Sequence, residues 1–212
     1  MKVSIFWQLQ CEKLADEIAD MTNISPSLYE AFSKINRSEF CPIEKHAYTL
    51  DPQPIAGNQW ISSPLTVAKM TMALELDNVD KILEIGCGSG YQAAILSKLV
   101  RRVFTIERIE SLANEAKQHF TKLNISNIHV RFDDGNLGWQ KYAPYERILL
   151  SAAATKIDER LFEQLDIDGI LIAPIEKNGT QNIVKFHKIS TSQINEYTLE
   201  ECQFVPILTG KE

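Results

Sequence analysis

The stretch that most constrains the fold runs from Lys81 to Tyr91 and reads Lys-Ile-Leu-Glu-Ile-Gly-Cys-Gly-Ser-Gly-Tyr. Its apolar first half predicts a buried strand and its alternating glycines predict a tight turn. Apolar residues at helical spacing from Ala93 to Val100 then predict a helix. Glycine permits positive φ angles and lets backbone N–H groups come close to a ligand. Because the first N–H groups of a helix are unpaired and partly positive, this turn favours an anionic group.

Two features around the turn point to a nucleoside-containing cofactor. The next predicted strand ends in Glu107, 21 residues after Gly86. An acid at that point of a βαβ unit can accept hydrogen bonds from both ribose hydroxyls. The spacing is G-x-G-x-G, Glu84 lies two residues before Gly86, and Tyr91 stands where a dinucleotide fingerprint has its last glycine. This pattern resembles the first motif of the S-adenosylmethionine-dependent methyltransferases and disfavours NAD.

Strands and helices alternate through the middle of the chain. Strands are expected near residues 81–85, 102–107, 127–132, 146–151 and 169–175, and helices near residues 90–100, 109–122 and 157–165. This alternation predicts an α/β fold, with a Rossmann-like, mostly parallel sheet that has helices on both faces. Ligands bind at the carboxyl ends of such strands, so Asp134 and Gly135, after the third strand, are expected to contact adenine.

The segments on either side of this core complete the expected architecture. Residues 3–20 predict an amphipathic helix and Ser25-Pro26 opens a second one, which together form an N-terminal helical extension. Two C-terminal antiparallel strands are expected at Gln181–Ser190 and Tyr197–Leu208. We expect a single methyltransferase domain over residues 1–212: N-terminal helices and active-site loop in 1–78, cofactor-binding core in 79–176, closing strands in 177–212.

The segment from residue 37 to residue 62 is a long stretch without a sustained period. Its prolines indicate a loop, and its aromatic side chains argue against disorder. A loop of this length inside a compact domain is usually functional, so we expect it to fold over a site. Pro64 opens a further helix, and in an arbitrary Ser-Ser-Pro sequence either Ser62 or Ser63 would simply be its N-cap.

Composition and charge exclude several classes of protein. The net charge of −6 argues against broad nucleic-acid binding, and no apolar window is long enough to span a membrane. The N-terminal residues lack the apolar core of a signal peptide, so we expect a cytoplasmic protein. We also expect the protein to be a monomer. The cysteines show no C-x-x-C or zinc-ligand spacing, which predicts free thiols and no metal.

Several segments together resemble the protein-L-isoaspartate O-methyltransferase family over nearly the whole chain. The Ile-Ser-x-Pro, Trp139 and triple-alanine segments are much more specific than the glycine turn, which many methyltransferases share. The matching segments are Asp51–Ile55, Ile61–Pro64, Leu83–Ala94, Thr105–Arg108, Asp134-Gly135, Leu137–Trp139, Ala143–Tyr145, Ala152–Ala154, Gln164-Leu165, Gly169, Pro174 and Phe204–Pro206.

This resemblance implies an enzyme and its substrate. The enzyme would transfer a methyl group from S-adenosyl-L-methionine to the α-carboxylate of L-isoaspartyl residues in damaged proteins, and the ester would close to a succinimide. Ser62 would be the active-site serine. The cofactor would be held by Ile61, Glu84, Gly86, Gly88, Gly90, Glu107, Asp134 and Gly135.

The chain departs from the family pattern mainly before Ser62. Family members commonly read Ile-Gly-x-Gly-Gln-Thr-Ile-Ser, whereas residues 55–62 read Ile-Ala-Gly-Asn-Gln-Trp-Ile-Ser, and Asp133 replaces a frequent glycine. The bulky Trp60 bears on the fit of the acceptor more than on the cofactor. Two alternatives therefore stay open: a carboxyl methyltransferase with another acceptor, and a cofactor-binding module without catalysis. An intact Ser62 argues against the second.

The expected chemistry needs no strong base. A carboxylate is already ionised at neutral pH because an α-carboxyl group titrates near about 3.5. The contribution of the protein is then to hold the acceptor and the methyl donor in near-attack geometry and to exclude water. A serine hydroxyl donates one hydrogen bond, so Ser62 is expected to orient the carboxylate and not to act as a covalent nucleophile.

Overall fold

The computed structural model describes residues 2–212, with side chains from Ile5 onward, so Met1 of the expected N-terminal part lies outside it. Within residues 2–212, no helix is long and apolar enough to cross a membrane. The helices are α1 (Lys2–Met21), α2 (Pro26–Lys34), α3 (Pro64–Ala73), α4 (Tyr91–Leu96), α5 (Glu110–Lys122) and α6 (Glu159–Gln164). The short 3-10 helices are η1 (Arg37–Glu39), η2 (Glu44–His46), η3 (Gly135–Leu137) and η4 (Gln140–Tyr142). The strands are β1 (Gln53–Ile55), β2 (Gln59–Ile61), β3 (Lys81–Ile85), β4 (Arg102–Glu107), β5 (Ile128–Phe132), β6 (Tyr145–Leu150), β7 (Leu165–Lys177), β8 (Thr180–Lys188) and β9 (Ile194–Glu201).

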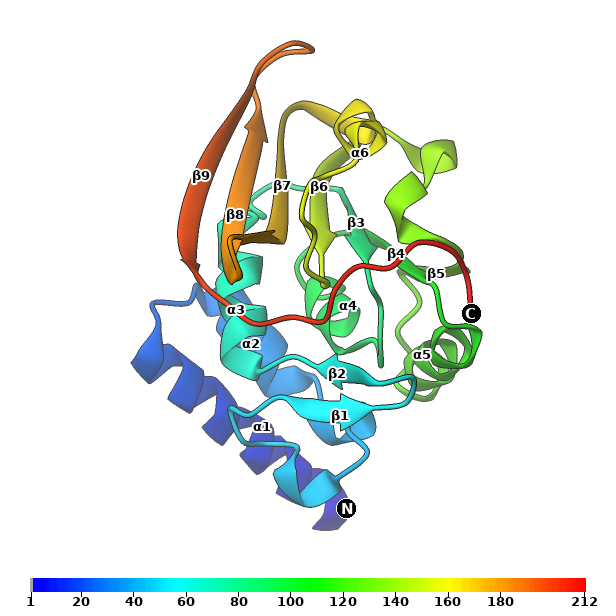
Figure 1. Cartoon of the computed structure of the whole chain (residues 1–212). Coiled ribbons are helices and arrows are strands. Elements are labelled where there is room, and N and C mark those ends of the chain that lie inside the picture. The colour runs from blue at the N-terminus through cyan, green and yellow to red at the C-terminus, as the bar shows by residue number, and fades with distance from the viewer. Residues whose placement is uncertain (1) are drawn as a thin grey trace.

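A seven-stranded sheet with the order β5-β4-β3-β6-β7-β8-β9 forms the centre of the molecule (Figure 1). The five strands from β5 to β7 pair in parallel, and β8 and β9 extend the sheet with antiparallel pairing. The predicted α/β fold is therefore confirmed. Because the strand order reverses between β3 and β6, the crevice at their carboxyl ends is the place where such folds bind ligands.

Side chains alternate across the sheet, so both of its faces are buried. Ile82 and Val103 pack with the core that includes α1–α5, whereas their neighbours Leu83 and Phe104 pack on the opposite face with α6. A strand that is covered on both faces carries apolar residues at successive positions, as at Ile82-Leu83 in β3 and Ile148–Leu150 in β6. The predicted helices on both faces are confirmed.

The segment between α2 and α3 is ordered around a small hairpin. The strands β1 and β2 pair antiparallel and lie in front of the helical extension (Figure 1). Its turn places Gly57 and Asn58 at φ angles of 65° and 53°. Asparagine tolerates this left-handed conformation, which explains how Asn58 can stand where the family commonly has glycine. The departure at this position leaves the hairpin intact.

The second closing strand differs from the prediction. It was expected over Tyr197–Leu208, but β9 spans Ile194–Glu201 and residues 202–212, called here the closing segment, leave the sheet. The segment runs across the carboxyl ends of the parallel strands towards α5 (Figure 1). Ala153 donates its backbone N–H to Val205 at 2.8 Å and accepts one from Ile207 at 2.7 Å. Cys202 still donates its backbone N–H to Gln181 of β8 at 3.0 Å, and beyond it the backbone of the segment pairs with the strand-end backbone after β6.

Candidate active site

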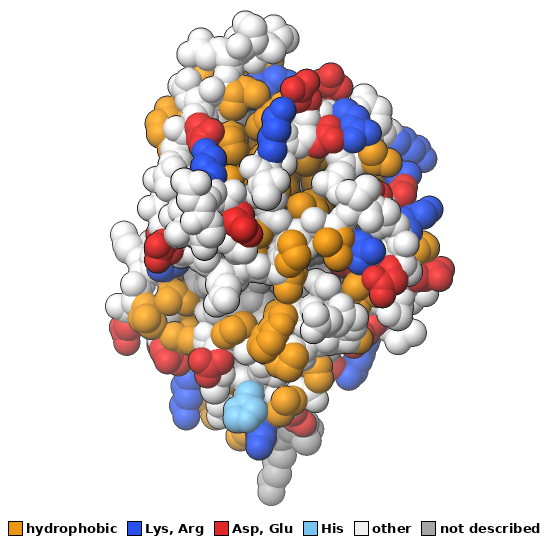
Figure 2. All heavy atoms as spheres, viewed as in Figure 1, with side chains coloured by type: hydrophobic (Ala, Val, Ile, Leu, Met, Phe, Trp, Pro, Cys, Tyr) orange, Lys and Arg blue, Asp and Glu red, His pale blue; other side chains and the backbone are white. Residues whose placement is uncertain are grey.

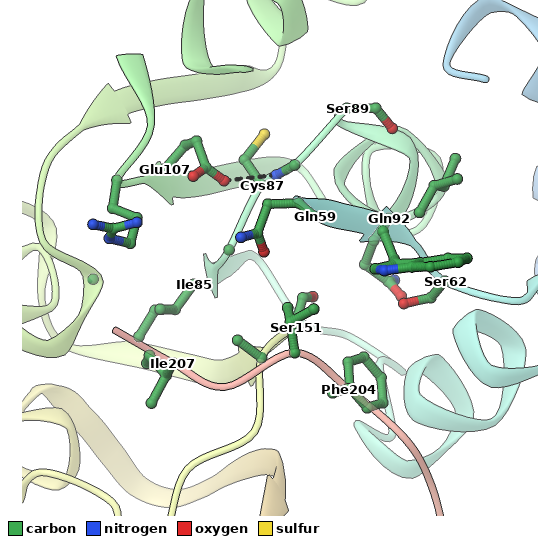
Figure 3. A pocket seen from close by; sticks show the side chains of 18 of the residues that line it. Gln59, Ser62, Ile85, Cys87, Ser89, Gln92, Glu107, Ser151, Phe204 and Ile207 are labelled. Carbon is green, nitrogen blue, oxygen red and sulfur yellow. Dashed lines mark hydrogen bonds between the residues drawn. The ribbon is translucent and has the colours of Figure 1, made fainter. Parts of the chain in front are cut away.

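The glycine turn after β3 uses its amides inside the protein. The N–H groups of Gly86 and Cys87 donate to the Ile106 carbonyl at 2.9 and 3.2 Å. The N–H of Gly88 donates to Oε2 of Glu107 at 2.8 Å (Figure 3). All three glycines of the turn have positive φ angles. The anionic group that the turn was expected to favour is thus the Glu107 carboxylate itself.

Glu107 is held rigidly at the end of β4. Its second oxygen, Oε1, accepts the backbone N–H of Ile109 at 3.0 Å, and only 5% of the residue is exposed. Each carboxylate oxygen can accept more than one hydrogen bond, so both keep the capacity to bind a hydroxyl. A fixed acceptor pair at this strand end has the geometry needed to hold the two hydroxyls of a ribose.

A cavity with an empty volume of about 950 Å³, counting the space at its mouth, lies at the switch point between β3 and β6. In the space-filling view, hydrophobic side chains gather in the middle of this face of the molecule (Figure 2). Six of the predicted site residues line the cavity: Ile61, Ser62, Gly86, Gly88, Glu107 and Gly135. Glu107 and Ser62 lie at opposite ends of the close-up view (Figure 3).

The other three predicted residues lie behind this lining. Glu84 is fully buried in β3 and Gly90 is the N-cap residue of α4. Asp134 caps η3, where its Oδ1 accepts the backbone N–H of Asn136 at 2.9 Å. Cofactor binding by these three residues stays a prediction, and any role they have would act through the residues that face the cavity.

Gly135 shows why the cavity wall needs a glycine. A Cβ atom at this position would lie 2.3 Å from Cγ2 of Ile85, the last residue of β3. No real side chain tolerates that distance, so the backbone after β5 can approach β3 this closely only without a Cβ. Gly135 therefore presents its main chain to the cavity, as the adenine contact expected from the sequence requires.

Asp134 and Arg108 fasten the closing segment over the cavity. Oδ2 of Asp134 accepts the backbone N–H of Gly210 at 2.7 Å, and Arg108 donates from Nε to the Gly210 carbonyl at 3.0 Å. Burial raises the pKa of Asp134, but the hydrogen bonds from Gly210 and Asn136 outweigh it, so the pKa is lowered. Asp134 is therefore ionised and keeps its hold on the segment at neutral pH.

The closing segment supplies cavity residues that sequence reasoning missed. Phe204, Val205, Pro206, Ile207 and Leu208 all line the cavity, and Phe204 and Ile207 face it from the side opposite the glycine turn (Figure 3). Their apolar run predicts a closing strand, which the structure does not form at these residues. The proline within it was the available signal, because proline cannot donate to a sheet ladder and marks a place where pairing ends.

Glu84 is a buried acid beneath the turn. Its Oε2 accepts a hydrogen bond from the Thr105 hydroxyl at 2.5 Å, while its Oε1 has no partner among the described residues. Burial raises the pKa of Glu84 to about 8; the Thr105 bond opposes this, and the negative charge of Glu107 adds to it. Glu84 is therefore predominantly a neutral carboxylic acid at pH 7.

Glu84→Gln is expected to remove a pH dependence from the stability of the cofactor-free protein. The folded state raises the pKa of Glu84 above its ordinary value of 4.5. The contribution of protonated Glu84 to the free energy of unfolding is therefore full below about pH 4.5 and is lost as the pH rises through about 8. Relative to the variant, the wild-type unfolding free energy should fall by about 1.4 kcal/mol per pH unit in this window. Urea unfolding of both proteins measures the difference, and parallel pH curves would contradict it.

A second cavity adjoins the first. It has an empty volume of about 1160 Å³, counting the open space at its mouth, and shares five lining residues with the first cavity. The shared residues are Trp60, Ser62, Ser151, Phe204 and Val205. No residue that lines the second cavity carries a charged side chain. Of the shared residues only the two serines carry a hydroxyl, so Ser62 stands where the two cavities meet and can donate a hydrogen bond there.

The fold and the site together define a class of protein. A parallel sheet with a glycine turn after its first strand, an acid at the end of the next strand and a cavity at the switch point characterise the Rossmann-like S-adenosylmethionine-dependent methyltransferases. The cavity residues fit this cofactor, because Glu107 presents a fixed acceptor pair and Gly135 lines the cavity without a side chain.

Comparison with known proteins identifies the family. The family model described as Protein-L-isoaspartate(D-aspartate) O-methyltransferase (PCMT) matches residues 10–212. A protein-L-isoaspartate O-methyltransferase of Helicobacter pylori (strain J99) is 51% identical over 209 residues, which cover 98% of each chain. A protein-L-isoaspartate O-methyltransferase of Trichlorobacter lovleyi is 40% identical over 186 residues, which cover 87% of this chain and 86% of that protein. The chain belongs to the protein-L-isoaspartate O-methyltransferase family.

Solved structures agree with this assignment. A protein-L-isoaspartate O-methyltransferase structure superimposes with a TM-score of 0.85 at 26% identity, over 92% of this chain and 65% of that one. A Plasmodium falciparum structure described as a putative protein-L-isoaspartate O-methyltransferase beta-aspartate methyltransferase (PCMT), in complex with S-adenosyl-L-homocysteine, gives a TM-score of 0.83 over 93% of this chain and 98% of that one. At 20% identity, the second structure supports the fold alone. This chain is accordingly an S-adenosylmethionine-dependent methyltransferase.

Proposed function

We propose that the two cavities divide the repair reaction between them. The first holds S-adenosyl-L-methionine, with its ribose on Glu107. The second receives the L-isoaspartyl residue of a damaged protein, and Ser62 orients its α-carboxylate where the cavities meet. The observation that carries this proposal is the position of Ser62, which lines both cavities at once.

The chemistry of the lining supports this division. When bound, S-adenosyl-L-methionine would supply an electrophilic methyl group for a carboxylate oxygen and would leave as the neutral thioether S-adenosyl-L-homocysteine. Ser62 can donate one hydrogen bond to the second carboxylate oxygen and leave the attacking oxygen free. The closing segment covers the site with the apolar side chains of Phe204 and Ile207, which exclude water from the reacting atoms.

Partners and location follow from the same proposal. Damaged proteins and peptides that carry an isoaspartyl residue are the substrates. We propose that the protein acts as a monomer in the cytoplasm, without nucleic-acid or membrane partners. The net charge of −6 supports the proposal that nucleic acid is not a partner. The cysteines Cys11, Cys41, Cys87 and Cys202 are free thiols, as is usual in a reducing compartment.

Trp60 offers a test of how the acceptor is held. It lines both of them, and 51% of its surface is exposed. An exposed indole ring at the mouth of the acceptor cavity can pack against a peptide backbone. Trp60→Thr is expected to raise the KM for an isoaspartyl peptide about fivefold, with the Kd for the cofactor unchanged. Steady-state kinetics and calorimetric titration measure the two constants, and an unchanged KM would remove this role of Trp60.

Methyl transfer to a matched peptide pair tests the proposed function. The two peptides differ only in one residue, L-isoaspartate or L-aspartate, and the donor is radiolabelled S-adenosyl-L-methionine. Base-labile methyl ester should form on the isoaspartyl peptide alone. No transfer to either peptide, with cofactor binding intact, would overturn the proposal in favour of another acceptor or of a binding module without catalysis.

A further inference from the structure

A fully buried arginine lies beneath the active-site loop. Arg37, the first residue of η1, is 0% exposed, although burying a charge is costly unless strong partners compensate for it. Its partners are three backbone carbonyl groups. Nη1 donates to Ala47 at 2.8 Å, and Nη2 donates to Asp51 at 3.3 Å and to Ser62 at 3.1 Å. The bond to Ser62 joins this buried charge directly to the serine at the meeting point of the cavities.

These three carbonyls define one segment. Ala47 and Asp51 lie before the β1–β2 hairpin and Ser62 lies directly after it. One planar guanidinium therefore holds both ends of the hairpin together. The rigid fork of an arginine can bind several oxygens at fixed angles, which the single ammonium group of a lysine cannot reproduce. The backbone of Ser62 is set by Arg37 and not only by the short pairing of β1 with β2.

The same guanidinium also contacts the cofactor side of the site. Its central carbon lies 5.4 Å from the centroid of the Tyr91 ring. Tyr91 is 2% exposed and is the first residue of α4, directly after Gly90 of the glycine turn. A guanidinium against an aromatic face is a favourable cation–π contact. Arg37 thus bridges the turn that faces the cofactor cavity and the serine that faces both cavities.

We infer that Arg37 is a positioning residue that sets the distance between the acceptor carboxylate on Ser62 and the cofactor at the glycine turn. This inference rests on the proposed function, because it assigns Arg37 a task in that reaction. In-line methyl transfer requires the reacting atoms to approach within roughly 3–3.5 Å, and a misplacement of about 1 Å costs about 100-fold in rate. Arg37 touches neither substrate, so it acts through Ser62.

Arg37→Lys keeps the positive charge and removes the fork. We expect kcat with the isoaspartyl peptide to fall at least about tenfold, while the Kd for S-adenosyl-L-methionine stays within about twofold, because the glycine turn and Glu107 are intact. Arg147→Lys is the matched control. Arg147 also donates to backbone carbonyls, those of Leu74 and Glu75, but far from Ser62 in the chain. The control should lose stability and keep kcat.

A double-mutant cycle separates positioning from general loosening. If Arg37 acts through Ser62, the loss caused by Arg37→Lys should shrink to less than about twofold in a Ser62→Ala background. Fully additive losses would overturn the inference, and so would a kcat of the Arg37→Lys variant equal to that of the wild type. Arg37→Gln, which keeps two N–H donors without the charge, takes the place of the lysine variant if that variant does not fold.

Hydrogen exchange tests the inference without any activity. In Arg37→Lys, backbone amides of residues 47–62 should exchange faster, whereas those of β3 and β4 should not change. Unchanged exchange in residues 47–62 would overturn the inference. If the wild type failed to methylate the isoaspartyl peptide but this local pattern appeared, the proposed function would fail while the bridging role of Arg37 would stand. The two failures are therefore distinguishable.

Discussion

Glu107→Gln is expected to weaken binding of S-adenosyl-L-methionine about 100-fold. The wild-type carboxylate accepts two backbone N–H groups, from Gly88 at 2.8 Å and from Ile109 at 3.0 Å. A glutamine amide has only one oxygen, so its NH2 group would face one of these donors and the ribose would lose an acceptor. Losing one hydrogen bond to a charged group costs about 1.5–3 kcal/mol, and the upper part of this range corresponds to that factor in Kd.

Calorimetric titration of the cofactor measures this effect. Glu110→Gln provides the control. Glu110 is exposed at the start of α5, and its substitution removes the same charge three residues after Glu107. The control should bind the cofactor as the wild type does. An unchanged Kd in Glu107→Gln would mean that the ribose is held elsewhere in the cavity, and that the Glu107 carboxylate serves only to close the glycine turn.

Ser62→Ala is expected to reduce kcat/KM for an isoaspartyl peptide about 10- to 100-fold. The variant loses the one hydroxyl that the loop places where the cavities meet, and a hydrogen bond to a charged group is worth about 1.5–3 kcal/mol. The Kd for the cofactor should stay within about twofold, because Ser62 lies at the end of the cavity away from Glu107 (Figure 3). Steady-state kinetics at saturating cofactor measure the loss.

The control for this variant is Ser33→Ala. Ser33 lies in α2, where its hydroxyl only donates to the Glu30 carbonyl at 3.0 Å. It should retain the wild-type kcat/KM. A Ser62→Ala protein with unaltered turnover would remove the orienting role from Ser62 and would direct attention to Ser151, the other hydroxyl that both cavities share.

The sequence predicted the parts of this site that depend on local pattern. The strand, glycine turn and helix at residues 81–96 follow from an apolar run, alternating glycines and a return to helical spacing. The nearness of Glu107 to the glycine turn follows as well, because adjacent parallel strands end at the same edge of a sheet, whereas the hydrogen bond from Gly88 to Glu107 is seen only in the structure. Local chemistry and topology agree here, so a single sequence was sufficient.

The remaining features depend on contacts between distant segments. The run from Phe204 to Leu208 has the apolar character of a strand, and only its pairing with Ala153 shows that it closes the cavity. Arg37 lies in a polar stretch and would be assigned to the surface, because arginine is rarely fully buried. Its three carbonyl partners lie 10, 14 and 25 residues away, so no local pattern reveals them.

The most direct test of the two-cavity site is a crystal structure with both ligands bound. The protein would be crystallised with S-adenosyl-L-homocysteine and an L-isoaspartyl peptide. The ribose should lie on Glu107, and an oxygen of the isoaspartyl α-carboxylate should lie roughly 2.6–3.2 Å from Oγ of Ser62, at the junction that Trp60 and Phe204 share. A peptide bound outside the second cavity, with its carboxylate away from Ser62, would contradict the account.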